Sequence, residues 1–114
     1  MQAGELALLL DMQLLLPAMA EQEVPIQGCY IGDLLSNVMG RALTGQLWYT
    51  VMTNINIMAV AQLLDLSGIV LLEDNRPMEG VLERAEMEGI PVFITKENAY
   101  DAAARFRASG LPGA

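Results

Sequence analysis

The residues 32–40, GDLLSNVMG, place two glycines around acidic and amide side chains, directly after an apolar run. A glycine turn between a strand and a helix can hold a phosphate group. A Walker-type loop needs G-x-x-x-x-G-K-[ST], but these glycines are eight positions apart and Lys96 is the only lysine in the chain. The spacing therefore favours Asp33 as the N-cap of a short helix, with Gly32 allowing the turn. A ligand-contacting loop remains the alternative, because open α/β sheets bind ligands at the carboxyl ends of their strands.

Three more polar loops are expected at the same edge, namely TNIN (53–56), EDNRP (73–77) and TKEN (95–98). The TNIN side chains offer neutral hydrogen-bonding groups at a helix N-terminus, which either cap the helix or receive an anion. Glu73 and Asp74 could hold a divalent cation, although adjacent carboxylates more often form a solvated loop. No metal site and no cofactor are predicted. The candidate ligand-binding residues are Gly32, Asp33, Thr53, Asn54 and Asn56.

Catalytic side chains are scarce. The chain has no histidine, so its serines and Cys29 lack the commonest activating base. An enzyme would have to rely on carboxylates such as Asp33 and Glu73. The sequence therefore predicts a protein that is not an enzyme.

Composition restricts the partners and the compartment. Fourteen acidic against six basic residues give a net charge of −8, which repels a phosphate backbone and argues against nucleic-acid binding. A single cysteine allows no internal disulfide, which suits the cytoplasm. The apolar N-terminal segment has no positive n-region and is too short to span a membrane, so we expect it to be part of the core.

The elements that position these loops follow from hydrophobic periodicity. From residue 47 onward, strands and helices alternate with short loops, which predicts a mostly parallel α/β sheet flanked by helices, in one domain covering 1–114. The predicted helices cover 3–10, 34–43, 55–66, a segment from Met78 to Gly89, and a last helix capped by Asn98. The predicted strands cover 12–16, 24–31, 47–52, 68–72 and 90–95.

Two features predict where the chain buries its apolar side chains. The helix 55–66 is apolar nearly all round, so we expect its second side to pack on another subunit. Trp48 and Tyr49 are adjacent in a strand and must point to opposite faces. We expect one of them in the core and the other at an interface or rim.

Four segments, GDLLSNVM, the W-Y-T strand, N-I-x-A-V-A and A-x-x-x-G-I-P-V, resemble the DRTGG domain family, and in particular its small stand-alone members. The resemblance covers nearly the whole chain. It implies a fold similar to the N-terminal domain of HPr kinase/phosphorylase, an α/β module without catalysis that also occurs beside CBS domains in regulatory regions. The chain has neither a P-loop nor a contiguous D-R-T-G-G string, so the resemblance concerns the fold and not a kinase activity.

The expected function is therefore that of a non-catalytic regulatory or scaffold module that self-associates as a dimer and works by packing. A further protein partner is possible. The alternative is a sensing domain for a small molecule, either a nucleotide or another anion. Nucleic acid and membrane are not expected as partners.

Overall fold

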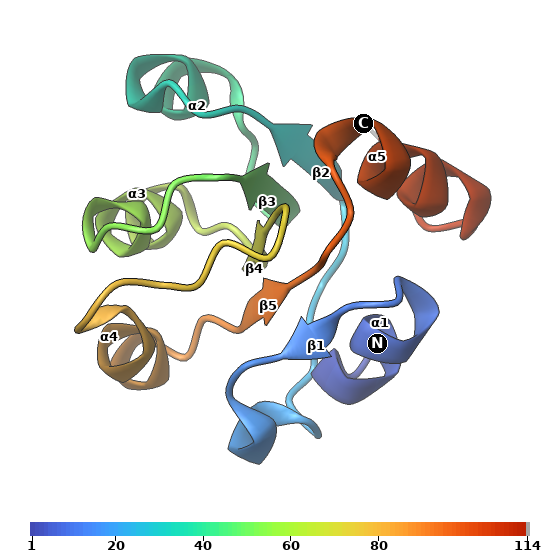
Figure 1. The fold of residues 1–114 in the computed structure, drawn as a ribbon, viewed down its shortest axis with the longest axis horizontal. Helices are drawn as coiled ribbons and strands as arrows, with labels where there is room; N and C mark the ends of the chain where they lie inside the picture. Colours follow the sequence, from blue (N-terminus) through green and yellow to red (C-terminus); the bar gives the residue numbers. More distant parts are fainter. Residues whose placement is uncertain (114) are drawn as a thin grey trace.

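The computed structural model describes residues 1–113. These described residues form five strands, five α-helices and one short 3-10 helix (Figure 1). In chain order these are α1 (Ala3–Leu9), β1 (Gln13–Leu14), η1 (Pro17–Met19), β2 (Gly28–Ile31), α2 (Leu35–Arg41), β3 (Gln46–Thr50), α3 (Asn56–Leu64), β4 (Gly68–Leu71), α4 (Val81–Glu88), β5 (Val92–Ile94) and α5 (Ala99–Ala108).

The strands form one sheet in the order β1-β5-β4-β3-β2. Strands β2 to β5 are parallel and each pairs with the next one in sequence, while β1 pairs antiparallel with β5. Because all three crossovers run in the same direction, α2, α3 and α4 cover one face of the sheet, and α1 and α5 cover the other (Figure 1). This confirms the predicted single α/β domain with a mostly parallel sheet.

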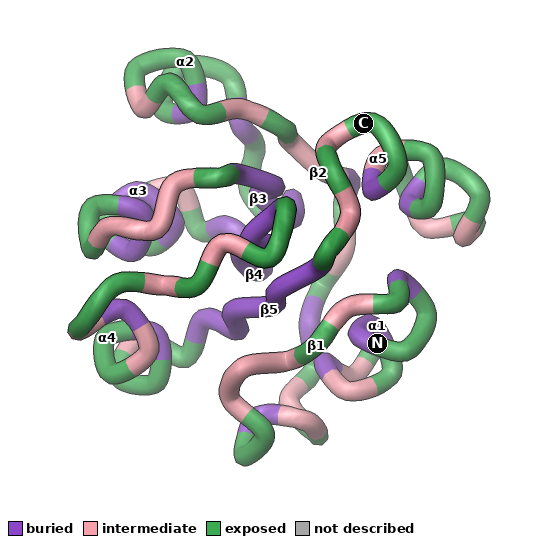
Figure 2. Tube along the Cα trace, in the orientation of Figure 1, coloured by how far each residue is buried: buried purple, intermediate pink, exposed green. Residues whose placement is uncertain are grey.

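Two apolar clusters lie on the two faces of the sheet, and Figure 2 shows the buried strands β3, β4 and β5 between partly exposed helices. Trp48 belongs to the cluster under α2, α3 and α4, and Tyr49 to the cluster under α1 and α5, as their adjacency predicted. Both side chains are buried, so the expectation that one lies at an interface or rim was wrong. The reason is α5, whose Phe106 meets the Tyr49 ring edge to face, with centroids 6.3 Å apart.

The predicted elements all exist, but several are shorter than expected. The predicted strand 12–16 pairs only at Gln13 and Leu14, and the predicted strand 24–31 begins at Gly28. Met78 lies outside α4, because Gly80 in a left-handed conformation is the N-cap of that helix. The Asn98 side chain caps α5 as predicted, accepting a hydrogen bond of 2.9 Å from the Asp101 N–H.

Helix α3 is buried on one side only. Its inner side chains, Ile57, Met58, Val60 and Ala61, enter the core. Ile55 before the helix and Leu63 near its end are exposed. Within residues 1–113, no helix combines the length and the hydrophobicity needed to span a membrane.

Candidate functional site

The four parallel strands end at the same edge of the sheet, so the polar loops that follow them share that edge, as expected from the sequence. The strand order proceeds in one direction from β2 to β5. There is consequently no point within these four strands where successive crossovers diverge to opposite faces, which is where such sheets usually open a crevice.

Asp33 does not cap α2. The N-cap position belongs to Leu34, and no side chain caps that helix. The Asp33 carboxylate oxygen Oδ1 instead accepts a hydrogen bond from the Thr50 hydroxyl (2.7 Å) and one from the Val51 N–H (2.9 Å). Asp33 therefore fastens the β2–α2 loop to the end of β3. The prediction failed because a cap bonds its own helix, whereas here a neighbouring strand end supplies the donors.

The backbone N–H and carbonyl of Gly32 also form hydrogen bonds within the chain. Its N–H donates to the Tyr49 carbonyl (3.1 Å), and its carbonyl accepts from the Trp48 indole N–H (2.9 Å). A Cβ atom at this position would lie 2.9 Å from a ring carbon of Tyr30. The close approach of the Tyr30 ring explains the glycine without a ligand.

The TNIN loop is similarly occupied by internal contacts. The Asn54 side-chain oxygen accepts from the Asn56 N–H (2.9 Å), and the Thr53 carbonyl accepts from the Met78 N–H (2.9 Å). The structure thus shows local turn-forming roles for these residues. Ligand binding by Gly32, Asp33, Thr53, Asn54 and Asn56 stays a prediction.

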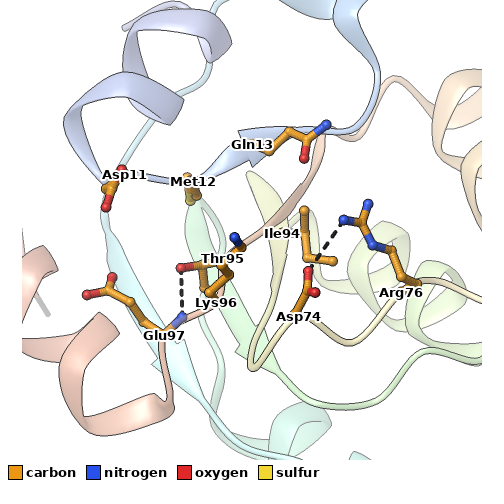
Figure 3. Close-up of a pocket in the computed structure, with 9 residues that line it drawn as sticks. All are labelled: Asp11, Met12, Gln13, Asp74, Arg76, Ile94, Thr95, Lys96 and Glu97. Carbon is orange, nitrogen blue, oxygen red and sulfur yellow. Dashed lines mark hydrogen bonds and ion pairs between the residues drawn. The ribbon is translucent and has the colours of Figure 1, made fainter.

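A cavity of about 410 Å³ lies at the opposite end of the same edge, beside β4, β5 and β1. None of the five candidate residues lines it. Three segments meet there: the turn after α1, the β4–α4 loop and the β5–α5 loop (Figure 3). The lining residues are Asp11, Met12, Gln13, Asp74, Arg76, Ile94, Thr95, Lys96 and Glu97.

The charges in this cavity differ in how firmly they are held. Glu97 forms two hydrogen bonds of 2.9 Å with the Arg105 guanidinium, which raise the pKa of that guanidinium above its usual value. Asp11 lies 3.8 Å from the same guanidinium. On the other side, Arg76 approaches Asp74 only at 3.4 Å, and Lys96 forms no ion pair within residues 1–113. The Glu97 carboxylate is therefore firmly held, whereas Asp11 and the cations Arg76 and Lys96 are loosely held.

Unusual backbone conformations gather around the cavity. Among residues 1–113, four non-glycine residues have positive φ, and three of them, Asp11, Glu73 and Asp74, lie in or next to it. Asp11 ends α1 with the Met12 N–H bonded to the Ala7 carbonyl, an ordinary helix terminus. Glu73 and Asp74 are consecutive, at φ 58° and 56°, in a turn closed by a hydrogen bond from the Asn75 N–H to the Leu72 carbonyl (3.1 Å). Such a turn normally uses Asn, Asp or Gly, so Glu73 in particular carries strain.

The strained turn also joins two loops of the cavity. The Glu73 N–H donates to the Glu97 carbonyl (2.9 Å), and the Asp74 N–H donates to the Thr95 carbonyl (2.8 Å). The loops EDNRP and TKEN, which the sequence places at the same edge, are thus in contact. What sequence reasoning missed is the contribution of residues 11–13, because only the pairing of β1 with β5 brings that segment to the edge.

Other potentially reactive groups are isolated. Cys29 is half-buried, and burial raises the pKa of its thiol although the nearby Arg107 partly offsets this. Within residues 1–113, no three carboxylate or thiol side chains are grouped as a metal site would require. The cavity beside β4 and β5 is thus a place where acidic and basic side chains from distant segments meet.

Comparison with known proteins identifies the fold. No protein-family model matches the chain, and no curated protein sequence matches it. Among solved structures, the chain is similar to the CBS and DRTGG domains of the regulatory region of Clostridium perfringens pyrophosphatase, crystallised with the activator diadenosine tetraphosphate. The TM-score is 0.67 at 14% identity, over 97% of this chain and 47% of that chain.

At this identity the likeness concerns the fold alone, and the chain spans about half the length of that structure. The chain has a DRTGG-like α/β fold, which confirms the resemblance suggested by the sequence.

Proposed function

We propose that this chain is a non-catalytic regulatory module that acts by binding a second copy of itself. The observation that carries this proposal is the charge distribution: in a chain of net charge −8, residues 34–64 contain one charged residue, Arg41. This stretch includes α2 and α3, which lie side by side on one face of the sheet (Figure 1). We call the solvent side of these two helices, with the turns that flank them, the neutral face.

The neutral face exposes several large apolar side chains. On α3, the exposed residues Ile55, Ala59 and Leu63 follow helical spacing and form one stripe. Leu34, Met39 and Leu43 are exposed on or beside α2. Burying one such side chain contributes about 1.5–3 kcal/mol, whereas association costs at least about 4 kcal/mol. Several of them are needed together, and the neutral face provides them.

The charge distribution is compatible with a second copy as the occupant if the contact is made through the neutral face. Two copies with a charge of −8 repel each other at long range. Contact through acidic faces would add short-range repulsion, whereas residues 34–64 of the neutral face contain no carboxylate, and Asp33 and Asp65 stand directly before and after this stretch. A two-fold arrangement brings each neutral face onto its equal, which is the commonest form of protein dimer. The fold of a regulatory region in a known protein agrees with a role without catalysis.

The test is the oligomeric state by light scattering, with the wild type expected as a dimer at micromolar concentration. Leu63 is 68% exposed, so Leu63→Glu leaves the core intact and weakens self-association by about tenfold or more, because the interface then buries a charge. The matched control is Leu8→Glu, on α1 at the other face of the sheet, where the side chain is 86% exposed. Circular dichroism verifies that both variants fold.

A monomeric wild type would overturn the proposal. Equal dissociation by Leu8→Glu and Leu63→Glu would overturn the choice of the neutral face.

The second candidate function is the sensing of a small molecule. It is supported by the structural neighbour, whose regulatory region was crystallised with a nucleotide activator. A thermal-shift panel of adenine nucleotides and phosphates tests it, since a ligand that binds the folded chain raises its melting temperature. Absence of any shift would remove this candidate and leave the first one standing.

A further inference from the structure

We infer that the cavity at the ends of β4 and β5 is a binding site for a sugar phosphate, either free or as part of a nucleotide. This inference rests on the second candidate function and assigns it a place and a chemistry. The volume of about 410 Å³ is within the range of pockets that hold small ligands. The position at the carboxyl ends of parallel strands is the usual one in open α/β sheets.

The cations identify the side that receives the phosphate. Arg76 and Lys96 are two of only six basic residues in the chain, and both line this cavity. Lys96 has no acidic partner within residues 1–113. Arg76 meets Asp74 at 3.4 Å, a distance longer than a good charge-assisted hydrogen bond, and both side chains are exposed. A phosphate can therefore recruit both cations without breaking a strong ion pair.

The acidic side explains why a bare anion is a poorer fit than a sugar phosphate. Figure 3 shows Asp11 and Glu97 on one side, Asp74 and Arg76 on the other, and Thr95 and Lys96 between them. Arg105 neutralises Glu97 in part through its two hydrogen bonds of 2.9 Å, so the Glu97 carboxylate is fixed in position. Carboxylates accept hydrogen bonds from sugar hydroxyls, as the acidic residue of dinucleotide-binding folds does. A sugar phosphate matches this arrangement, because its phosphate can contact Arg76 and Lys96 while its hydroxyls donate to Glu97.

The strained turn supports the same assignment. Glu73 and Asp74 hold consecutive left-handed conformations where the chain passes the cavity. Such strain in non-glycine residues is common at ligand-binding segments, where the surrounding structure maintains it. Here the two backbone hydrogen bonds from the turn to Thr95 and Glu97 maintain it, at 2.8 and 2.9 Å.

Isothermal titration calorimetry tests the inference with four probes. Ribose 5-phosphate and AMP are expected to bind, whereas ribose and adenosine, which lack the phosphate, are not. Binding of both phosphates with similar affinity assigns recognition to the sugar phosphate, and much tighter binding of AMP assigns part of it to the base. Failure of both phosphates to bind, or equal binding of adenosine and AMP, would overturn the inference.

Variants locate the site. Lys96→Gln and Arg76→Gln are each expected to weaken binding of AMP by about tenfold, since each removes one charged donor. Arg107→Gln is the matched control, because Arg107 lies in the last turn of α5, does not line the cavity and forms no ion pair within residues 1–113. Asp74→Asn is expected to tighten binding several-fold, because it releases Arg76 and removes a negative charge. A merely structural role of Asp74 would not produce that gain.

The outcomes separate this site from the sensing function. If AMP binds the wild type and the Lys96 and Arg76 variants equally, sensing stands and the cavity is the wrong site. If the variants lose binding but AMP leaves the oligomeric state of the wild type unchanged, the cavity is a binding site that does not regulate self-association.

Discussion

At the scale of single residues, Asp33 is a candidate ligand-binding side chain whose hydrogen bonds stabilise the fold. Its carboxylate accepts two hydrogen bonds from the end of β3, one of them from the fully buried Thr50. From the sequence, an Asp before a helix predicts a cap, because the neighbouring strand is invisible in a local pattern. By contrast, Asn98 was predicted correctly, since its partner, Asp101, is three residues away in the same helix.

Tyr49 gives a prediction for alkaline pH. Burial raises the pKa of its phenol above the usual value, and the charges of Cys29 and Glu97 raise it further. As the pH passes about 10, the unfolded chain loses this proton while the folded chain keeps it. The free energy of unfolding therefore decreases above about pH 10, by at most about 1.4 kcal/mol per pH unit from this group.

The measurement is urea unfolding of the wild type and Tyr49→Phe at neutral and at alkaline pH. Tyr49→Phe keeps the ring packed against Phe106 and should remove this part of the alkaline loss. Tyr100→Phe is the control, because the Tyr100 side chain is 83% exposed. Equal alkaline losses in all three proteins would show that Tyr49 does not titrate differently in the folded state.

At the scale of elements, the sequence predicted which segments form helices and strands better than where they end. Hydrophobic periodicity identified α3 and α4, and Gly89 ended α4 in a left-handed conformation as expected. The start of α4 was misplaced because Met78 continues the apolar spacing, while the backbone turns at Gly80. Local spacing does not report on such a turn, nor on the cavity, whose segments 11–13 and 94–97 meet only through sheet pairing.

The turn at Glu73 and Asp74 gives a prediction for stability. A left-handed conformation costs an L-residue about 1–2 kcal/mol, whereas glycine adopts it freely but loses about 0.4–1 kcal/mol through unfolded-state entropy. Glu73→Gly should therefore stabilise the fold by about 0.5–1 kcal/mol. Glu86→Gly, in α4 beyond its first turn, should destabilise it by about 1 kcal/mol. Urea unfolding measures both changes, and destabilisation by Glu73→Gly would mean that the turn is not strained.

At the scale of the whole molecule, charge is the property that the sequence predicted most directly. A net charge of −8 could be read from composition. That residues 34–64 carry Arg41 as their one charge becomes informative only when the fold places α2 and α3 side by side. The apolar helix 55–66 was expected to contact another subunit, and its outer side is indeed exposed in the isolated chain. In the proposed dimer, this exposed side would be buried against the second copy.

Salt should affect the two proposed activities in opposite directions. Raising the salt concentration from about 0.05 to about 0.5 M screens the repulsion between two acidic chains, so self-association through the neutral face becomes tighter. Binding of AMP through Lys96 and Arg76 becomes weaker, because the same screening reduces attraction between exposed charges. Sedimentation equilibrium and calorimetry over this range measure both. Weakening of the dimer by salt would contradict an uncharged interface.

The pairing of β1 with β5 has a consequence for how the molecule folds. Strands β2 to β5 each pair with their neighbour in sequence, so this part can assemble by closing short loops. The register of Gln13 with Ile94 instead joins positions far apart in the chain, and its loop-closure entropy must be offset by a two-residue ladder and the packing of α1. The cavity beside β5 is thus completed only by the strand pairing of highest sequence separation, which makes an occupied cavity a reporter of fully folded chains.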